Sequence, residues 1–83
     1  MINVLFFAQV RELLGESSIQ VEAITEITTA ESLRAVLASK NEQWGKVLVS
    51  DKLLVAVNQT ISGWDMQVED GDEVAFFPPV TGG

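Results

Sequence analysis

The chain has 83 residues, of which 47% are hydrophobic and 20% are charged. This length suits one small domain and leaves no room for a large enclosed active site, so we expect a partner to complete any catalysis. Twelve acidic residues against five basic ones give a net charge of −7. That balance argues against nucleic acids and membranes as partners and favours a protein with a basic surface.

The residue types restrict the chemistry further. The sequence contains no His and no Cys, so it can form no Ser–His or Cys–His nucleophile pair, no zinc cluster and no disulfide framework. The N-terminal stretch lacks a basic leader region, and no apolar run approaches the roughly 20 residues that span a bilayer. We therefore expect a cytoplasmic protein that holds no metal or cofactor of its own.

The N-terminal third predicts an antiparallel pair of strands. Residues 2–9 (INVLFFAQ) are rich in β-branched and aromatic side chains, and residues 18–24 alternate in part. A polar–apolar turn of chain with Gly15 as a breaker connects them.

The middle of the chain predicts one main helix. Thr28 and Glu31 match a capping box, in which each side chain satisfies a backbone amide of the first turn. Apolar residues then recur at helical spacing, at Ala30, Leu33, Val36 and Leu37. The helix should end near Asn41, and a shorter, broken helical piece should follow it.

The C-terminal part predicts the remaining strands. A third strand covers residues 52–61 and ends in a turn at Asn58-Gln59, and a last strand covers residues 73–77 until Pro78 stops it. Strands on both sides of one helix predict an α+β fold, a mixed sheet with the helix packed on one face.

This arrangement leaves large apolar side chains without a place in the core. Neighbouring strand residues point to opposite faces, and a single helix covers only one face. We assign the longer apolar sets to the core, as Ile2, Val4, Phe6, Val74 and Phe76 with Leu33, Val36 and Leu37. Phe7 and Phe77 then lie on the open face, with Ile61 beside them. Either residues 61–68 fold over them, or they form an exposed patch of the kind that marks a partner surface.

The chain ends in FFPPVTGG. Pro78 and Pro79 fix φ and favour an extended path, so we divide the chain into a domain over residues 1–77 and a tail over residues 78–83. The last four residues can reach roughly 13–14 Å beyond the domain. Gly82 and Gly83 have no Cβ and can enter a channel too narrow for other residues.

Three stretches resemble the small subunit of molybdopterin synthase, a ubiquitin-like sulfur carrier. They are VLFFAQVRELLG at residues 4–15, LLVAVNQT at 53–60 and DGDEVAFFPPVTGG at 70–83. The resemblance covers nearly the whole chain and is weakest over residues 17–50. It implies the ubiquitin-like β-grasp fold, in which the first and last strands lie side by side in the middle of the sheet.

The resemblance also implies a function. An ATP-dependent adenylating enzyme of the E1 type would activate the Gly83 carboxylate, and a sulfur-donating enzyme would convert it to a thiocarboxylate. The tail would carry the sulfur into the large synthase subunit, where the dithiolene is built on cyclic pyranopterin monophosphate, in an assembly of two small and two large subunits. The chain itself would be a non-catalytic sulfur donor. The residues implied are Gly83 as the sulfur bearer, Val80, Thr81 and Gly82 as the channel segment, and Phe7, Ile61, Phe77 and Arg11 as contacts with the large subunit.

Other functions fit parts of the same pattern. A ubiquitin-like modifier would join Gly83 to a lysine after the same adenylation, and a thiamine-pathway carrier would use the same thiocarboxylate for a thiazole. A plain interaction module would use the patch around Phe7 and Phe77 and would tolerate residues added after Gly83, which no carrier would.

Overall fold

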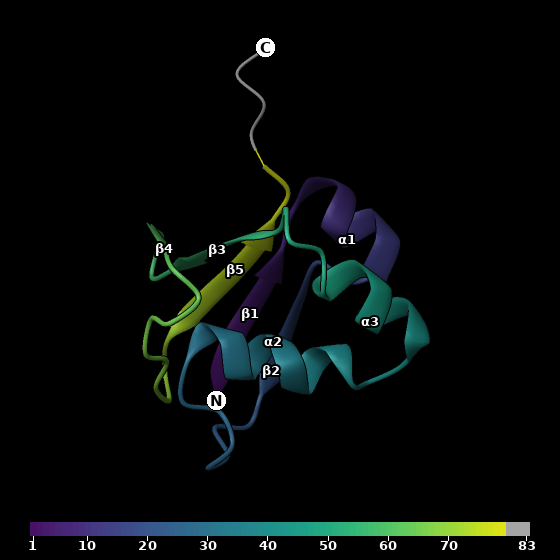
Figure 1. Cartoon of the computed structure of the whole chain (residues 1–83). Coiled ribbons are helices and arrows are strands. Elements are labelled where there is room, and N and C mark those ends of the chain that lie inside the picture. The colour runs from purple at the N-terminus through teal and green to yellow at the C-terminus, as the bar shows by residue number, and fades with distance from the viewer. Residues whose placement is uncertain (80–83) are drawn as a thin grey trace.

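The computed structural model describes residues 1–79, which form five strands and three helices (Figure 1). In chain order these are β1 (Ile2–Phe6), α1 (Ala8–Leu14), β2 (Ser18–Val21), α2 (Ala30–Ala38), α3 (Glu42–Leu48), β3 (Leu54–Val57), β4 (Thr60–Ser62) and β5 (Glu73–Phe77). Within residues 1–79, no helix has both the length and the apolar character needed to cross a membrane.

The five strands form one mixed sheet in the order β2-β1-β5-β3-β4. β1 and β5 run parallel, and every other pair is antiparallel. The first and last strands therefore lie side by side in the middle, as the resemblance predicts (Figure 1). The predicted antiparallel pairing of the first two strands is also confirmed.

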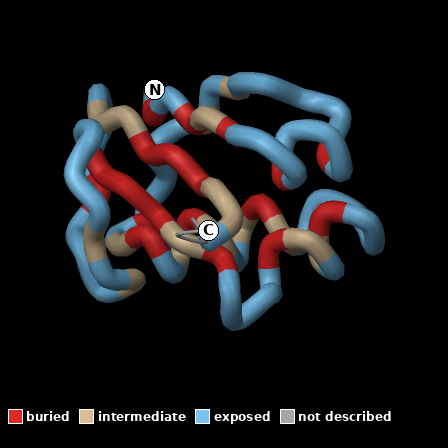
Figure 2. Tube along the Cα trace, turned by 90° about the horizontal axis from the view of Figure 1, so that it is seen from above, coloured by how far each residue is buried: buried red, intermediate tan, exposed pale blue. Residues whose placement is uncertain are grey.

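The core lies between one face of the sheet and the helices. All three helices contribute to a single buried cluster with β1, β3 and β5, and Figure 2 marks these buried positions along the strands and helices. The predicted core residues are all buried except Val36, which is half-buried at the edge of the cluster. The predicted α+β β-grasp class is confirmed, with three helices rather than one on the covered face.

A helix that the sequence pattern did not predict follows the first strand. β1 ends at Phe6, earlier than predicted, and α1 buries Val10 and Leu14. These two residues are four apart and so share one side of the helix. α1 ends at Gly15, whose φ of 76° is left-handed and whose N–H donates to the Arg11 carbonyl at 2.9 Å. The connection thus adds two core side chains where only a turn was predicted.

The main helix begins one residue later than predicted. Thr29, not Thr28, is the N-cap, and its hydroxyl accepts the Ser32 N–H at 3.2 Å while the Ser32 hydroxyl accepts the Thr29 N–H at 2.8 Å. Glu31 pairs instead with Arg34, one turn further along α2. The structure therefore has a capping box, but its residues are Thr29 and Ser32, whereas the prediction named Thr28 and Glu31.

α2 and α3 are separated by residues 39–41, and the Asn41 side chain sets the start of α3. α2 ends at Ala38, before the predicted end, and the Asn41 side chain accepts the Trp44 N–H at 2.9 Å. Asn41 is thus the N-cap of α3, and the predicted second helical piece is confirmed. The Trp44 ring packs edge-on against Phe6, with centroids 5.4 Å apart, and adds a core residue that was not predicted.

The predicted third strand is two strands joined by the predicted turn. Asn58 and Gln59 have φ values of 51° and 70°, which reverse the chain so that β4 pairs back onto β3. The Asn58 side chain also accepts the Glu73 N–H at 3.0 Å and so ties this turn to the start of β5. The predicted last strand matches β5.

Candidate functional site

The face of the sheet opposite the helices carries an apolar surface across its three central strands and β4. A cross-strand row joins Leu5, Ala75, Ala56 and Ile61, one residue from each of β1, β5, β3 and β4. Phe77 pairs with Leu54 in the next row of the same face. We call this surface the open-face patch, and it comprises Leu5, Phe7, Leu54, Ala56, Ile61, Ala75 and Phe77, of which the two alanines are buried and the others are half-buried or exposed.

The structure places all three predicted apolar contact residues in this patch. Ile61 is 69% exposed, Phe7 is 47% exposed and Phe77 is half-buried. Single exposed apolar residues are ordinary, but a contiguous set on one face is typical of an interaction surface. The patch is therefore available to a partner, and its use by one stays a prediction.

The segment after Ile61 does not cover the patch. It crosses to the helix side, where the Trp64 carbonyl accepts the Glu31 N–H and the Met66 carbonyl accepts the Ala30 N–H, both at 2.9 Å. The Trp64 ring stacks against Phe76 on the covered face, with centroids 5.9 Å apart. The alternative in which residues 61–68 fold over the exposed aromatics is therefore contradicted.

Phe7 and Arg11 lie together at the start of α1. Phe7 keeps extended backbone angles, φ −121° and ψ 153°, so its side chain continues the alternation of β1 and points away from the core. Its N–H donates to the Phe76 carbonyl at 3.2 Å, which holds it beside the end of β5. Arg11 follows one helical turn later and is exposed. Arg11 therefore supplies an exposed cation on the helix that follows Phe7.

The tail begins at the edge of this patch. β5 ends at Phe77, and Pro78 and Pro79 follow it as half-buried and exposed residues. The chain therefore leaves the domain from the centre of the sheet, beside Phe7. The predicted tail residues Val80, Thr81, Gly82 and Gly83 lie outside the described residues.

The acidic turn before β5, residues 69–72, is held by hydrogen bonds of its own carboxylates. The Asp72 carboxylate accepts the Glu69 N–H at 2.8 Å and the Asn58 side-chain amide at 3.1 Å. Asp70 accepts a hydrogen bond from the Met1 ammonium, and this bond and the ammonium charge lower the pKa of Asp70. Among residues 1–79, no group of three His, Cys, Asp or Glu side chains is placed to hold a metal ion.

Sequence reasoning missed two members of the patch on β3. Leu54 and Ala56 alternate with Val55 and Val57, which belong to the core cluster, so the same two-residue period that placed Phe77 could have placed them on the opposite face. The sequence pattern alone could not assign the faces, because β3 is apolar at every position. Only the pairing of β3 with β5 determines which alternate residues face the helices.

Comparisons with known proteins agree with this architecture. Residues 4–83 match the ThiS family. The molybdopterin synthase sulfur carrier subunit of Haemophilus influenzae is 54% identical over 83 residues, which are all of both chains.

Two solved structures share the fold. The solution structure of the HVO 2177 protein of Haloferax volcanii is similar at a TM-score of 0.78 with 27% identity, over 99% of this chain and 85% of that one. A complex of subunits 1 and 2 of the molybdopterin-converting factor of Helicobacter pylori contains a chain similar at a TM-score of 0.66 with 24% identity, over 99% of this chain and 97% of that one. With residues 4–83 matched and 54% identity over the full length, the chain belongs to the ThiS family and groups with its molybdopterin synthase sulfur carrier subunits.

Proposed function

We propose that this chain is the sulfur carrier subunit of a molybdopterin synthase. One observation carries the proposal, the 54% identity over the full length to a protein that bears that name. The fold adds a physical reason, because an exposed apolar face directly adjoins the point where the Gly-Gly tail leaves the domain. A partner that binds this face would receive the tail in a fixed direction.

The proposed chemistry takes place at the carboxylate of Gly83. A carboxylate is a poor electrophile because its leaving group would be oxide. An E1-like enzyme would therefore transfer AMP from ATP to Gly83 and release pyrophosphate. A sulfur-donating enzyme would then supply sulfur at the sulfide level, and its attack on the acyl carbon would release AMP and leave a thiocarboxylate. This chain would need no cofactor of its own, since the adenylating enzyme binds and uses the ATP.

The large synthase subunit is the proposed acceptor. There the thiocarboxylate sulfur would displace an oxygen substituent from a carbon of cyclic pyranopterin monophosphate, and water would then cleave the acyl–sulfur bond and restore the Gly83 carboxylate. Two such transfers would build the dithiolene. Gly82, with Thr81 and Val80, would pass through the channel that leads to the large subunit's active site. The H. pylori neighbour, which is a complex of two subunits, supports this kind of pairing. We place the process in the cytoplasm, in an assembly of two small and two large subunits.

The proposed contact surface is the open-face patch. Phe77, Ile61 and Phe7 would supply its apolar centre, and Arg11 a polar contact at its edge. The exposure of Ile61 and Phe7 supports this assignment, because their burial by a partner removes apolar area from water.

Reconstitution tests the proposal directly. The chain is mixed with its adenylating enzyme, ATP and a sulfur source, and intact-mass spectrometry follows the product. We expect a mass gain equal to sulfur replacing one oxygen, located in the C-terminal peptide. Only the modified form should convert the pyranopterin precursor when the large subunit is added. A matched control with one residue added after Gly83 should keep its fold and remain unmodified.

Other outcomes would select other functions. A covalent adduct on another protein's lysine would favour a ubiquitin-like modifier, and delivery of the sulfur to a thiazole would favour a thiamine-pathway carrier. Absence of adenylation by every such enzyme of the same organism would leave a plain interaction module.

A further inference from the structure

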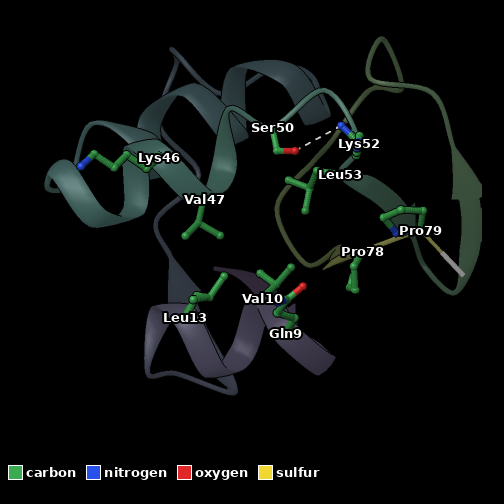
Figure 3. Close-up of a pocket in the computed structure, with 10 residues that line it drawn as sticks. All are labelled: Gln9, Val10, Leu13, Lys46, Val47, Ser50, Lys52, Leu53, Pro78 and Pro79. Atoms are coloured by element: carbon green, nitrogen blue, oxygen red, sulfur yellow. Dashed lines mark hydrogen bonds between the residues drawn. The ribbon is translucent and has the colours of Figure 1, made fainter.

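An apolar hollow lies beside Pro78 and Pro79, on the helix side of the sheet. Its volume is about 490 Å³, and it opens between α1, α3 and the chain that leads into β3. Figure 3 shows apolar side chains gathered around it, with the two prolines along one side. These residues are Val10, Leu13, Val47, Leu53, Pro78 and Pro79. We call this hollow the α1–α3 groove.

The α1–α3 groove and the open-face patch flank the same point of the chain. Leu53 lines the groove, whereas Leu54 belongs to the patch on the opposite face. Phe77 also belongs to the patch, and the next residue, Pro78, lines the groove. A partner that takes the tail therefore comes close to both surfaces at once.

The charge at the groove differs from that of the rest of the molecule. Lys46 and Lys52 line it, and they are two of only five basic residues in a chain of net charge −7. The Lys46 ammonium lies 3.7 Å from Glu42, while Lys52 makes no ion pair within residues 1–79. The Lys52 N–H donates to the Ser50 hydroxyl at 3.2 Å, which fixes the backbone at the rim (Figure 3). Lys52 therefore offers the rim a cation to which an acidic group can pair, whereas Glu42 already pairs with Lys46.

Two ligands could fill the groove. One is the chain's own last residues, and the other is a segment of the partner that receives them. The last residues offer one apolar side chain, Val80, and include Gly82 and Gly83, whose ordering costs the most backbone entropy. A segment of a folded partner is already ordered and loses less on docking. The balance therefore favours the partner over the tail.

We propose that the α1–α3 groove receives an apolar side chain from an acidic segment of the large subunit. The carrier would then be held on both sides of its tail base, by the open-face patch on one side and by the groove on the other. Half-exposed Leu13 would supply apolar contact, and Lys52 would pair with a carboxylate of the segment. This proposal rests on the proposed function, because it requires the large subunit as a partner.

Calorimetric titration of the full chain with the large subunit tests the groove. Leu13→Gln should raise the Kd for the large subunit about tenfold, as expected when an apolar contact of an interface is lost. Its matched control is Met66→Gln, because Met66 has a similar exposure, 45% against 47%, but lies on the loop against α2. Lys52→Glu should slow association and reduce the dependence of affinity on salt, whereas Lys40→Glu, with the same change in net charge, should do so less.

The outcomes separate the two proposals. If the parent chain binds the large subunit and Leu13→Gln and Lys52→Glu bind as tightly as their controls, the groove proposal is wrong and the proposed function stands. The groove proposal is also wrong if, in the free chain, Leu13→Gln shifts the NMR signals of residues 80–83 while the affinity for the large subunit stays unchanged, because the tail would then be the occupant. If the parent does not bind the large subunit at all, both proposals are overturned. Thermal unfolding of each variant verifies that these exposed substitutions leave the domain folded.

Discussion

At the residue scale, phenylalanines that are adjacent in the sequence lie on opposite faces of the sheet. Phe76 is fully buried and stacks on Phe6 with centroids 6.0 Å apart, while Phe77, next to it, lies on the open face. The same division separates Phe6 from Phe7. Substitutions of adjacent phenylalanines should therefore have different effects, one on stability and the other on binding.

Phe77→Ala and Phe7→Asp should weaken binding to the large subunit while leaving the domain folded. Large aromatic side chains at the centre of an interface typically contribute about 2 kcal/mol or more when truncated. Ile24→Ala is a suitable control, because Ile24 is 39% exposed and follows β2, away from the patch. Titration calorimetry measures the affinity. Unchanged affinity for both variants, or loss of the folded state, would show that the patch has been assigned wrongly.

Phe76→Ala should destabilise the domain without acting through a partner. It removes a ring that packs between Phe6 and Trp64, and truncation of a buried phenylalanine typically costs about 3–5 kcal/mol. That is a large part of the stability of a small domain. A chemical denaturation series on the free chain measures the loss. A midpoint equal to that of the parent would contradict the placement of Phe76 in the core.

At the scale of the element, short side chains decide where helices begin. Ser32 and Thr29 bond each other's backbone amides at the start of α2, and Asn41 caps the start of α3 in a similar way. Residues 39–41 thus end one helix and start the next. Three short helices can then pack side by side on one face, where a single long helix would leave part of the sheet uncovered.

Thr29→Ala should cost about 1 kcal/mol of stability, the usual effect of removing an N-cap side chain. Thr28→Ala is the matched control, because the structure engages only the backbone of Thr28, whose N–H donates to the Ser32 hydroxyl. Comparison of the two variants by thermal unfolding distinguishes the observed cap from the predicted one. A larger loss for Thr28→Ala would favour Thr28 as the N-cap.

At the scale of the whole molecule, the start of the chain is anchored to the domain, whereas the end of β5 leads away from it. The N-terminal ammonium pairs with Asp70, and the Met1 carbonyl accepts the Gly71 N–H at 3.0 Å, so the start of the chain is tied to the turn before β5. The other end leaves β5 between two apolar surfaces. Parallel pairing of β1 and β5 places these two features at opposite ends of the central strands (Figure 1).

The Asp70 pair should make stability depend on pH in the acid range. Its folded pKa lies below the ordinary value of roughly 4, so the charged carboxylate favours the folded state. The contribution should be fully present above the ordinary pKa and disappear as pH falls through the lowered one. Melting temperatures of the parent and Asp70→Asn, measured from pH 7 downward, should therefore differ near neutrality and converge in acid. A difference that grew as pH fell would contradict the pairing.

Local sequence determined much of this protein. The β5 strand and its end at Pro78 follow from residue type, because proline cannot continue the ladder, and the turn at Asn58-Gln59 reverses the chain where predicted. Two-residue alternation placed Phe76 inside and Phe77 outside. The Gly-Gly end and the stretches around it identified the family, since those residues carry the proposed chemistry themselves.

Tertiary structure decided what depends on contacts between distant residues. α1 is too short to be stable alone, and it forms because Val10 and Leu14 pack into a core built by strands at the other end of the chain. The path of the segment after Ile61 is set by hydrogen bonds to the start of α2, and this alone leaves the open-face patch uncovered. The α1–α3 groove likewise forms where Pro78 and Pro79 meet residues of α1, of α3 and of the chain that leads into β3. No local pattern carries such information, because each of these features depends on which surfaces meet after the chain has closed.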